Sequence, residues 1–281
     1  MSVEILEEAL ARVVVRALAE DLGDLGDVTT TSIVPPGTVM TGVIRSREAG
    51  RIAGVESIRQ VLSRLPEPAT ATIVTGDGTD VAAGDTVALL TGGARTLLIG
   101  ERLILNLIGR LSGIATATAA VVHAVEGTGV AVKDTRKTTP GLRLLEKYAV
   151  ACGGGVNHRY GLYDAVLIKD NHIGVAGSIT AAVGRARSSL GRRFPVQVEV
   201  DTLEQLDEAL ECGVSSVLLD NMTPDQLRTA VKMVGHRCHT EASGGITLTN
   251  VRAVAETGVD SISLGWLTHS ARSLDIGLDI D

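Results

Sequence analysis

The chain has 281 residues, a formal net charge of -7 and 44% hydrophobic residues, but only 2% aromatic residues. Its length allows about two domains, or one large barrel with an appendage. The acidic balance argues against a broad phosphate-backbone surface, and the scarcity of aromatic side chains argues against binding single-stranded nucleic acid. We therefore expect no nucleic-acid partner and an aliphatic core, which is typical of parallel strands covered by helices.

The N-terminal segment lacks the basic region and apolar run of a secretory signal. No stretch approaches the roughly twenty uninterrupted apolar residues of a membrane span. Cys152, Cys212 and Cys238 are far apart in the chain and form no zinc-type pattern. We therefore expect buried free thiols, a cytoplasmic location and no membrane partner.

The first half of the chain changes pattern twice. Apolar residues recur at helical spacing from residue 2 to about residue 20. Short β-rich pieces punctuated by glycines follow from residue 38 to about residue 93, which predicts a small sheet with tight turns. Helix-type residues return from residue 96 to about residue 125.

The second half alternates strand-like and helix-like runs. The strand-like runs lie at 130–134, 163–170, 195–201, 215–221, 238–245 and 260–265. Thr202 and Thr223 each begin a capping-box pattern between later strands, and glycines stand where helix C-caps belong. This alternation predicts a βα repeat with a parallel sheet. Polar residues end almost every strand, which favours a barrel over a doubly wound sheet.

If the barrel forms, the polar residues at the strand ends gather at one mouth in two groups of opposite charge. The basic group is Arg136, Lys137, Arg143, His158, Arg159 and Lys169. The acidic group is Glu199, Asp201, Asp220 and Glu241. Arginine and lysine bind carboxylate or phosphate, whereas carboxylates accept from sugar hydroxyls or hold Mg²⁺. The two groups together predict a ligand that is partly polyanionic and partly polyhydroxylated or metal-bound.

Two glycine-containing turns add a third element. The turn SGGI at 243–246 follows a strand and precedes a helix, and SLGW at 263–266 is similar. Such turns leave main-chain N–H groups free for an anion, and the last two loops of a barrel frequently bind phosphate.

Eight segments together resemble the quinolinate phosphoribosyltransferase family, also called nicotinate-nucleotide pyrophosphorylase (carboxylating). They are EDLGDLGDVTT (20–30), ERLILNLIGRLSGIATAT (101–118), DTRKTTPGLRLLEKYAV (134–150), GGGVNHRYGLYDAVLIKDNH (153–172), VEVD (198–201), LLDN (218–221), EASGGI (241–246) and SLGWLTHS (263–270). The resemblance covers almost the whole chain, and the RKTTPGLR and NHRYGLYDAVLIKDNH stretches are its most specific parts.

The resemblance implies an α/β fold with an N-terminal α/β sandwich domain at 1–104 and an incomplete, TIM-like parallel α/β barrel at 105–266. The tail at 267–281 could return to the first domain. The resemblance also implies a homodimer in which each site borrows a residue from the neighbour, with further assembly left open.

The family's functional residues carry over by motif. Quinolinate would be held by Arg136, Lys137, Thr138, His158, Arg159 and Lys169, with Arg102 acting in trans in the partner's site. Glu199 and Asp220 would face the ribose hydroxyls and Mg²⁺, directly or through water. Phosphate would be bound by Ser243, Gly244, Gly245, Leu264 and Gly265. The catalytic candidates are Lys137, Lys169, Glu199 and Asp220, and the roles of Lys133 and Arg143 stay open.

The implied activity is that of a pentosyl glycosyltransferase of NAD biosynthesis. It would join quinolinate to 5-phosphoribosyl-1-pyrophosphate and release nicotinate mononucleotide, pyrophosphate and CO₂. Two alternatives stay open, namely a related phosphoribosyltransferase with another acidic acceptor and a non-catalytic sensor of phosphate ligands. The number of cations in the basic group favours a dicarboxylate over a monocarboxylate.

Overall fold

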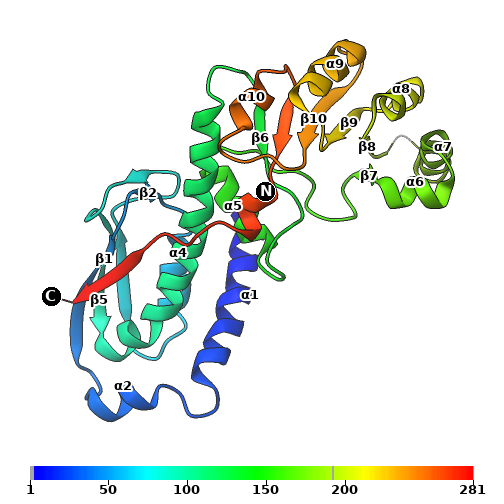
Figure 1. The fold of residues 1–281 in the computed structure, drawn as a ribbon. Coiled ribbons are helices and arrows are strands. Elements are labelled where there is room, and N and C mark those ends of the chain that lie inside the picture. Colours follow the sequence, from blue (N-terminus) through cyan, green and yellow to red (C-terminus); the bar gives the residue numbers. More distant parts are fainter. Residues whose placement is uncertain (1–2, 192, 281) are drawn as a thin grey trace. The chain divides into compact units, whose positions relative to one another are not determined.

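The computed structural model of the protein describes residues 3–191 and 193–280. The described chain folds as two compact units, and Figure 1 shows their helices and strands. Unit 1 contains residues 3–119, 138–154 and 267–280, whereas unit 2 contains residues 120–137, 155–191 and 193–266. The expected domain boundary after residue 104 lies inside a long helix. Residues 1, 2, 192 and 281, which include the expected start of the first helix, lie outside the described residues.

Unit 1 is built on a four-stranded antiparallel sheet in the order β12-β1-β5-β3. Its strands are β1 (Val39–Ser46), β3 (Ala69–Ile73), β5 (Thr86–Gly93) and β12 (Ile276–Ile280), with a short pair formed by β2 (Gly50–Arg51) and β4 (Asp80–Val81). Its helices are α1 (Val3–Leu22), α2 (Val28–Ile33), α3 (Glu56–Leu62), most of α4 (Ala94–Ala124) and α5 (Arg143–Cys152). The C-terminal tail belongs to this unit because β12 pairs with β1.

Helix α4 supplies much of the core of unit 1. Leu97, Ile104, Ile108 and Leu111 recur at helical spacing and are at most 2% exposed. By length and composition this helix could cross a membrane, although charged residues such as Glu101, Arg102 and Arg110 interrupt its apolar sequence. However, 67% of its apolar window is buried inside the protein, as in the core helix of a globular domain.

Unit 2 contains a six-stranded sheet in the order β6-β11-β10-β9-β8-β7, and all of its strand pairs are parallel. The strands are β6 (Ala131–Lys133), β7 (Val166–Ile168), β8 (Val196–Val200), β9 (Ser216–Asp220), β10 (His239–Ser243) and β11 (Ser261–Ser263). The helices between and after them are α6 (Asp170–Ala176), α7 (Ile179–Leu190), α8 (Leu203–Glu211), α9 (Pro224–Val234), α10 (Val251–Ala255) and α11 (Trp266–His269), the last of which continues into unit 1.

The sheet is an incomplete barrel, since β6 and β7 are its two edges and do not pair with each other within the described residues. Every strand-like run of the second half contains one of these strands. The predicted fold class, an incomplete parallel α/β barrel with an N-terminal α/β domain, is therefore confirmed.

Both capping-box patterns of the second half begin helices, but only one of them forms the complete capping box. Thr223 accepts from the N–H of Gln226, whose side chain reaches back to Thr223, so α9 begins with a complete capping box. Thr202 also accepts from the N–H of Gln205, but the Gln205 side chain binds the N–H of Asp201 instead. All three cysteines are free, as predicted, but they are only partly buried, so the prediction of their burial is wrong.

Candidate active site

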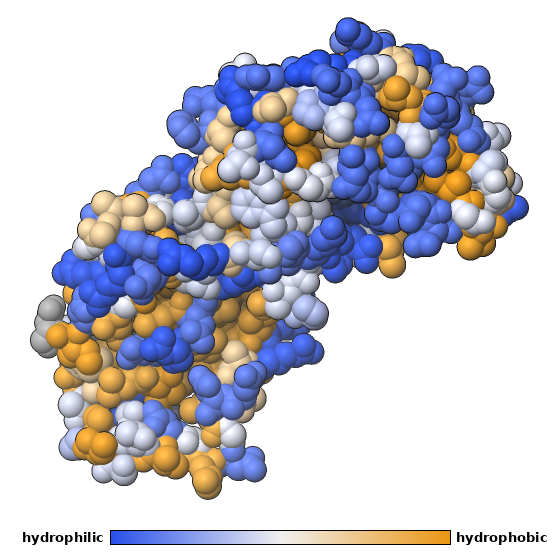
Figure 2. Space-filling model, in the orientation of Figure 1, coloured by the Kyte–Doolittle hydropathy of each residue, from blue (hydrophilic) through white to orange (hydrophobic). Residues whose placement is uncertain are grey.

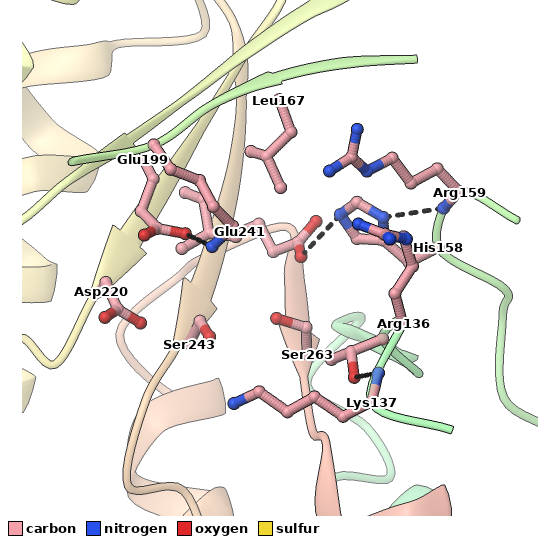
Figure 3. Close-up of a pocket in the computed structure, with 13 residues that line it drawn as sticks. Arg136, Lys137, His158, Arg159, Leu167, Glu199, Asp220, Glu241, Ser243 and Ser263 are labelled. Carbon is pink, nitrogen blue, oxygen red and sulfur yellow. Dashed lines mark hydrogen bonds and ion pairs between the residues drawn. The ribbon is translucent and has the colours of Figure 1, made fainter. Parts of the chain in front are cut away.

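A cavity of about 350 Å³ opens within unit 2, and its lining side chains lie on the strands or on the loops beside them. Figure 3 shows its residues, which come from all six strands or the loops beside them. The lining residues are Thr135, Arg136, Lys137, His158, Arg159, Leu167, Lys169, Glu199, Leu218, Asp220, Glu241, Ser243 and Ser263. The structure thus brings together eight of the predicted site residues, namely Arg136, Lys137, His158, Arg159, Lys169, Glu199, Asp220 and Ser243.

One wall of the cavity is strongly basic. Arg136 and Lys137 follow β6, and Arg159 lies on the loop that precedes β7. Burial and the neighbouring Arg136 guanidinium lower the pKa of Arg159, while Asp164 acts in the opposite direction. Arg159 is anchored by a hydrogen bond of 3.0 Å from its Nη1 atom to the carbonyl of Ala165. A dianion bound in the cavity would stabilise the charged form of Arg159, which burial and the neighbouring guanidinium disfavour.

The opposite wall carries carboxylates. Lys169, at the end of β7, forms an ion pair with Glu199 of β8. Asp220 ends β9 and accepts a hydrogen bond of 2.7 Å from the side-chain amide of Asn221. The Glu199 side chain is 13% exposed, so its charge faces the cavity more than bulk water. These carboxylates can accept from hydroxyl groups or share a cation with a bound phosphate.

The turn after β10 is tightly built. Ser243 lines the cavity, and its carbonyl accepts from the N–H of Asn221 at 2.9 Å. Gly244 has φ +86°, and an added Cβ would lie 2.1 Å from the Oδ1 atom of Asn221. Only glycine fits there, because any side chain would collide with Asn221 in a left-handed backbone conformation. The predicted phosphate turn is therefore held against the end of β9.

Six predicted site residues do not line this cavity, namely Arg102, Thr138, Gly244, Gly245, Leu264 and Gly265. Arg102 and Thr138 belong to unit 1, and Arg102 is exposed on α4. The hydroxyl of Thr138 accepts from Nε of Arg143 at 3.0 Å, which gives Arg143 a contact within unit 1. The N–H of Leu264 donates to the carbonyl of Lys133, so it is already used in the sheet.

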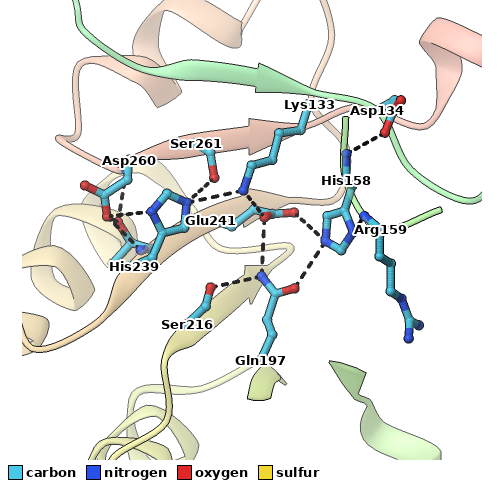
Figure 4. A network of polar contacts seen from close by, with 11 residues as sticks. Lys133, Asp134, His158, Arg159, Gln197, Ser216, His239, Glu241, Asp260 and Ser261 are labelled. Atoms are coloured by element: carbon cyan, nitrogen blue, oxygen red, sulfur yellow. Dashed lines mark hydrogen bonds and ion pairs between the residues drawn. The ribbon is translucent and has the colours of Figure 1, made fainter. Parts of the chain in front are cut away.

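A buried polar network beneath the cavity was not anticipated from the sequence (Figure 4). Its centre is Glu241, whose side chain is 1% exposed and accepts from Nζ of Lys133 at 2.9 Å. Asp134 is fully buried and accepts from the N–H of His158 at 2.8 Å. Glu241 was already expected at the mouth of the barrel, and the alternation of polar residues at His239, Glu241 and Ser243 along β10 is the signal that could have added His239 to the same face of the strand.

Metal binding can be judged from the donor set. Among the residues that the structure describes, no group of three or more histidines, cysteines or acids could hold a metal ion. Mg²⁺, however, is commonly held by one or two carboxylates together with substrate phosphates rather than by a protein cage. Glu199 and Asp220 supply such a pair, so the cavity fits Mg²⁺ that arrives with a phosphorylated ligand.

The incomplete barrel and its cavity define a class of protein with a basic wall facing a carboxylate pair, an arrangement that suits anionic ligands. The chain belongs to the quinolinate phosphoribosyl transferase family. The model of the family's C-terminal domain matches residues 114–279, and that of the N-terminal domain matches residues 27–112. The resemblance seen in the sequence is therefore confirmed.

The chain is similar in sequence and structure to known proteins along nearly its whole length. The chain is 47% identical to the nicotinate-nucleotide pyrophosphorylase (carboxylating) of Mycobacterium leprae, covering 94% of this chain and 95% of the relative. It is 46% identical to a probable enzyme of the same name from Bacillus subtilis, over 93% of this chain and 90% of the relative. The crystal structure of nicotinate-nucleotide pyrophosphorylase from Ehrlichia chaffeensis superposes with a TM-score of 0.92 at 42% identity, covering 96% of this chain and 98% of that one.

Proposed function

We propose that this chain transfers the phosphoribosyl group of 5-phosphoribosyl-1-pyrophosphate to quinolinate and removes one carboxylate as CO₂. The product is nicotinate mononucleotide, an intermediate of NAD biosynthesis, released with pyrophosphate. The observation that carries this proposal is the convergence of Arg136, Lys137, Arg159 and Lys169 on the cavity that also contains Glu199 and Asp220.

The chemistry needs positioning more than a nucleophilic side chain. The pyridine nitrogen attacks the anomeric carbon of the ribose, and pyrophosphate leaves with the electron pair of the broken bond. The ring nitrogen becomes cationic, so the adjacent ring carbon can keep the electron pair when its carboxylate leaves as CO₂. That carbon then takes a proton from solvent. The protein holds two anions that would otherwise repel each other in reacting geometry.

The basic residues and the carboxylates of the cavity bind different parts of the two substrates. Arg136, Lys137 and Arg159 bind the two carboxylates of quinolinate, together with Lys169, which pairs with Glu199. Glu199 and Asp220 accept from the ribose hydroxyls and stabilise the positive charge that develops on the sugar. Mg²⁺, when bound with the donor, would neutralise the charge of the departing pyrophosphate. The turn that contains Ser243, Gly244 and Gly245 binds the 5-phosphate, with Leu264 and Gly265 of the next loop beside it.

We also propose a homodimer in which Arg102 enters the partner's site. Two observations support this proposal. Arg102 is exposed on α4, whose other face is buried, and unit 1 carries large apolar side chains that are exposed. Leu25, Ile33 and Val39 are between 70% and 85% exposed, and Figure 2 shows hydrophobic residues on the visible surface of this unit. The free cysteines support a reducing, cytoplasmic location.

The deciding experiment measures CO₂ released from carboxyl-labelled quinolinate, with and without the phosphoribosyl donor and Mg²⁺. We expect release only when all three components are present, together with nicotinate mononucleotide in equal amount. Turnover of nicotinate in place of quinolinate would instead favour the related phosphoribosyltransferase. Binding of both ligands with no product from the purified wild-type protein would favour the non-catalytic sensor.

A further inference from the structure

Two cavities of unit 2 meet at the same three side chains. The candidate active site and a second cavity of about 480 Å³ are both lined by His158, Arg159 and Glu241. The second cavity extends past residues that precede or begin β8, β9 and β10, which is the opposite end of the strands. These three side chains therefore form the floor of the active site, and their contacts decide how rigid that floor is.

Glu241 makes contacts on both of its carboxylate oxygens. Its Oε2 atom accepts from Nζ of Lys133 at 2.9 Å and from Nε2 of Gln197 at 3.3 Å. Its Oε1 atom lies 3.4 Å from Nε2 of His158. Burial raises the pKa of Glu241. The neighbouring His158 and Lys133 and the hydrogen bonds from Lys133 and Ser263 act in the opposite direction and outweigh burial, so the pKa lies below its ordinary value. Glu241 is thus an ionised, fully buried carboxylate.

The ring of His158 is fixed by contacts at both nitrogens. Its Nδ1 atom accepts from the main-chain N–H of Arg159 at 2.7 Å, so this nitrogen carries no proton. Its Nε2 atom lies 3.1 Å from Oε1 of Gln197. The Nε2 atom of Gln197 donates to Glu241 at 3.3 Å and to the hydroxyl of Ser216 at 3.1 Å, and these two contacts hold the amide in that orientation. The proton therefore belongs on Nε2, where the Gln197 oxygen accepts it and the Glu241 carboxylate lies 3.4 Å away.

We propose that Glu241 is a positioning residue for the dicarboxylate site. It orients His158, directly and through Gln197, and His158 in turn fixes the main chain of Arg159. This inference rests on the proposed function and deepens it, because it assigns quinolinate affinity to a buried residue that need not touch quinolinate. A purely structural role would be different, in that Glu241 would serve only to neutralise the buried ammonium of Lys133.

Two charge-balanced double variants separate these roles. In Lys133→Met with Glu241→Met, both charges are removed and His158 loses the carboxylate that lies beside its Nε2 atom. In Lys133→Met with Glu241→Gln, the charges are also removed, but the amide oxygen can still accept from Nε2 of His158. The two variants differ by one polar group at residue 241, so they form a matched pair.

The proposal predicts that the methionine pair raises the KM for quinolinate about tenfold relative to the glutamine pair, the usual effect of losing one buried acceptor near a charged site. The KM for the phosphoribosyl donor should stay within about twofold in both variants. Equal quinolinate KM values in the two folded variants would overturn the proposal and leave Glu241 as a counter-ion for Lys133. Asp260→Asn, at the far end of the network, is the control for a carboxylate-to-amide change.

A second measurement does not depend on turnover. Nitrogen NMR of the histidine rings in the wild-type protein, with His158 assigned by the loss of its signals in His158→Gln, reports which ring nitrogen bears the proton. We expect the Nε2–H form near neutral pH, and a proton on Nδ1 would overturn the proposal. If the wild-type protein fails to convert quinolinate, the proposed function fails, while the ring tautomer still tests whether Glu241 and Gln197 orient His158.

Discussion

The ammonium of Lys169 forms an ion pair with the carboxylate of Glu199, and this pair joins the end of β7 to β8 inside the cavity. Both charges are also expected to contact substrates, so each substrate competes with an internal partner. We expect Lys169→Met to raise the KM for quinolinate and Glu199→Gln to lower kcat, each by about 10²-fold or more. Steady-state kinetics with each substrate varied in turn will separate the two effects.

The double variant provides the control for this pair. If the two residues serve the reaction separately, Lys169→Met with Glu199→Gln should combine the raised KM and the lowered kcat. A double variant with nearly wild-type kinetics would show that the ion pair only holds the barrel together.

Arg159 provides a test of the proposal that the basic wall binds a dicarboxylate. Lysine keeps the charge of arginine but loses its planar, two-pronged donor geometry. Arg159→Lys should therefore raise the KM for quinolinate about tenfold or more, with little change in the KM for the phosphoribosyl donor. Arg185→Lys on the exposed surface of α7 is the matched control and should leave both constants unchanged. A rise in both KM values for Arg159→Lys would contradict the division of the site.

The sequence predicted the barrel and its basic wall because both depend on local patterns. Apolar strands such as Val166–Ile168 stand out by composition, and strand-end residues such as Lys169 follow them directly. The partners of Lys133 could not be predicted in the same way, because Glu241 lies more than a hundred residues away and the contact depends on the strand order β6-β11-β10. The boundaries of the two units could not be predicted from local patterns either. Residues 138–154 lie between two barrel segments in the sequence but fold with unit 1.

Arg102 tests the proposed exchange between subunits. If it acts in trans, Arg102→Ala and Lys169→Met should each be nearly inactive alone when assayed at quinolinate concentrations near the wild-type KM. Mixed dimers of the two variants would then contain one intact site, made of an unaltered barrel and the partner's intact arginine. Random mixing in equal amounts should recover about a quarter of the wild-type sites. The measurement is activity after joint refolding or co-expression, and the absence of any recovery in verified mixed dimers would argue for sites complete within one chain.

Arg110 should contribute to stability rather than catalysis. Its Nη2 atom donates to the fully buried carboxylate of Glu146 at 2.8 Å, and its Nη1 atom donates to the carbonyl of Ala271. The same carboxylate accepts from the N–H and hydroxyl of Thr139, so one ion pair joins α4, α5, the tail and the loop before α5 within unit 1. Removing one partner of a buried pair leaves an uncompensated charge, so Arg110→Ala should lower the free energy of unfolding by about 3–5 kcal/mol.

Urea unfolding will measure this loss. Arg59→Ala removes an ion pair on the surface of α3 and is the control, with an expected change below about 1 kcal/mol. A change for Arg110→Ala as small as that for Arg59→Ala would mean that Glu146 is sufficiently held by Thr139 alone.

His239 should make the folded protein sensitive to mild acid. Burial and the neighbouring Lys133 ammonium lower the pKa of His239, while Asp260 and Glu241 act in the opposite direction. Because the folded state then binds a proton less readily than the unfolded state, protonation favours unfolding. The stability contribution is complete above the ordinary pKa of 6.5 and is lost as the pH falls from there through the lowered value.

Urea unfolding at two pH values tests this expectation. The urea midpoint of the wild-type protein should decrease when the pH is lowered from 7.5 to 5, and it should decrease less in His239→Gln. His123→Gln, whose side chain is 86% exposed in the wild-type protein, should keep the wild-type pH dependence. Equal pH dependence in the wild type and His239→Gln would exclude His239 as the group responsible.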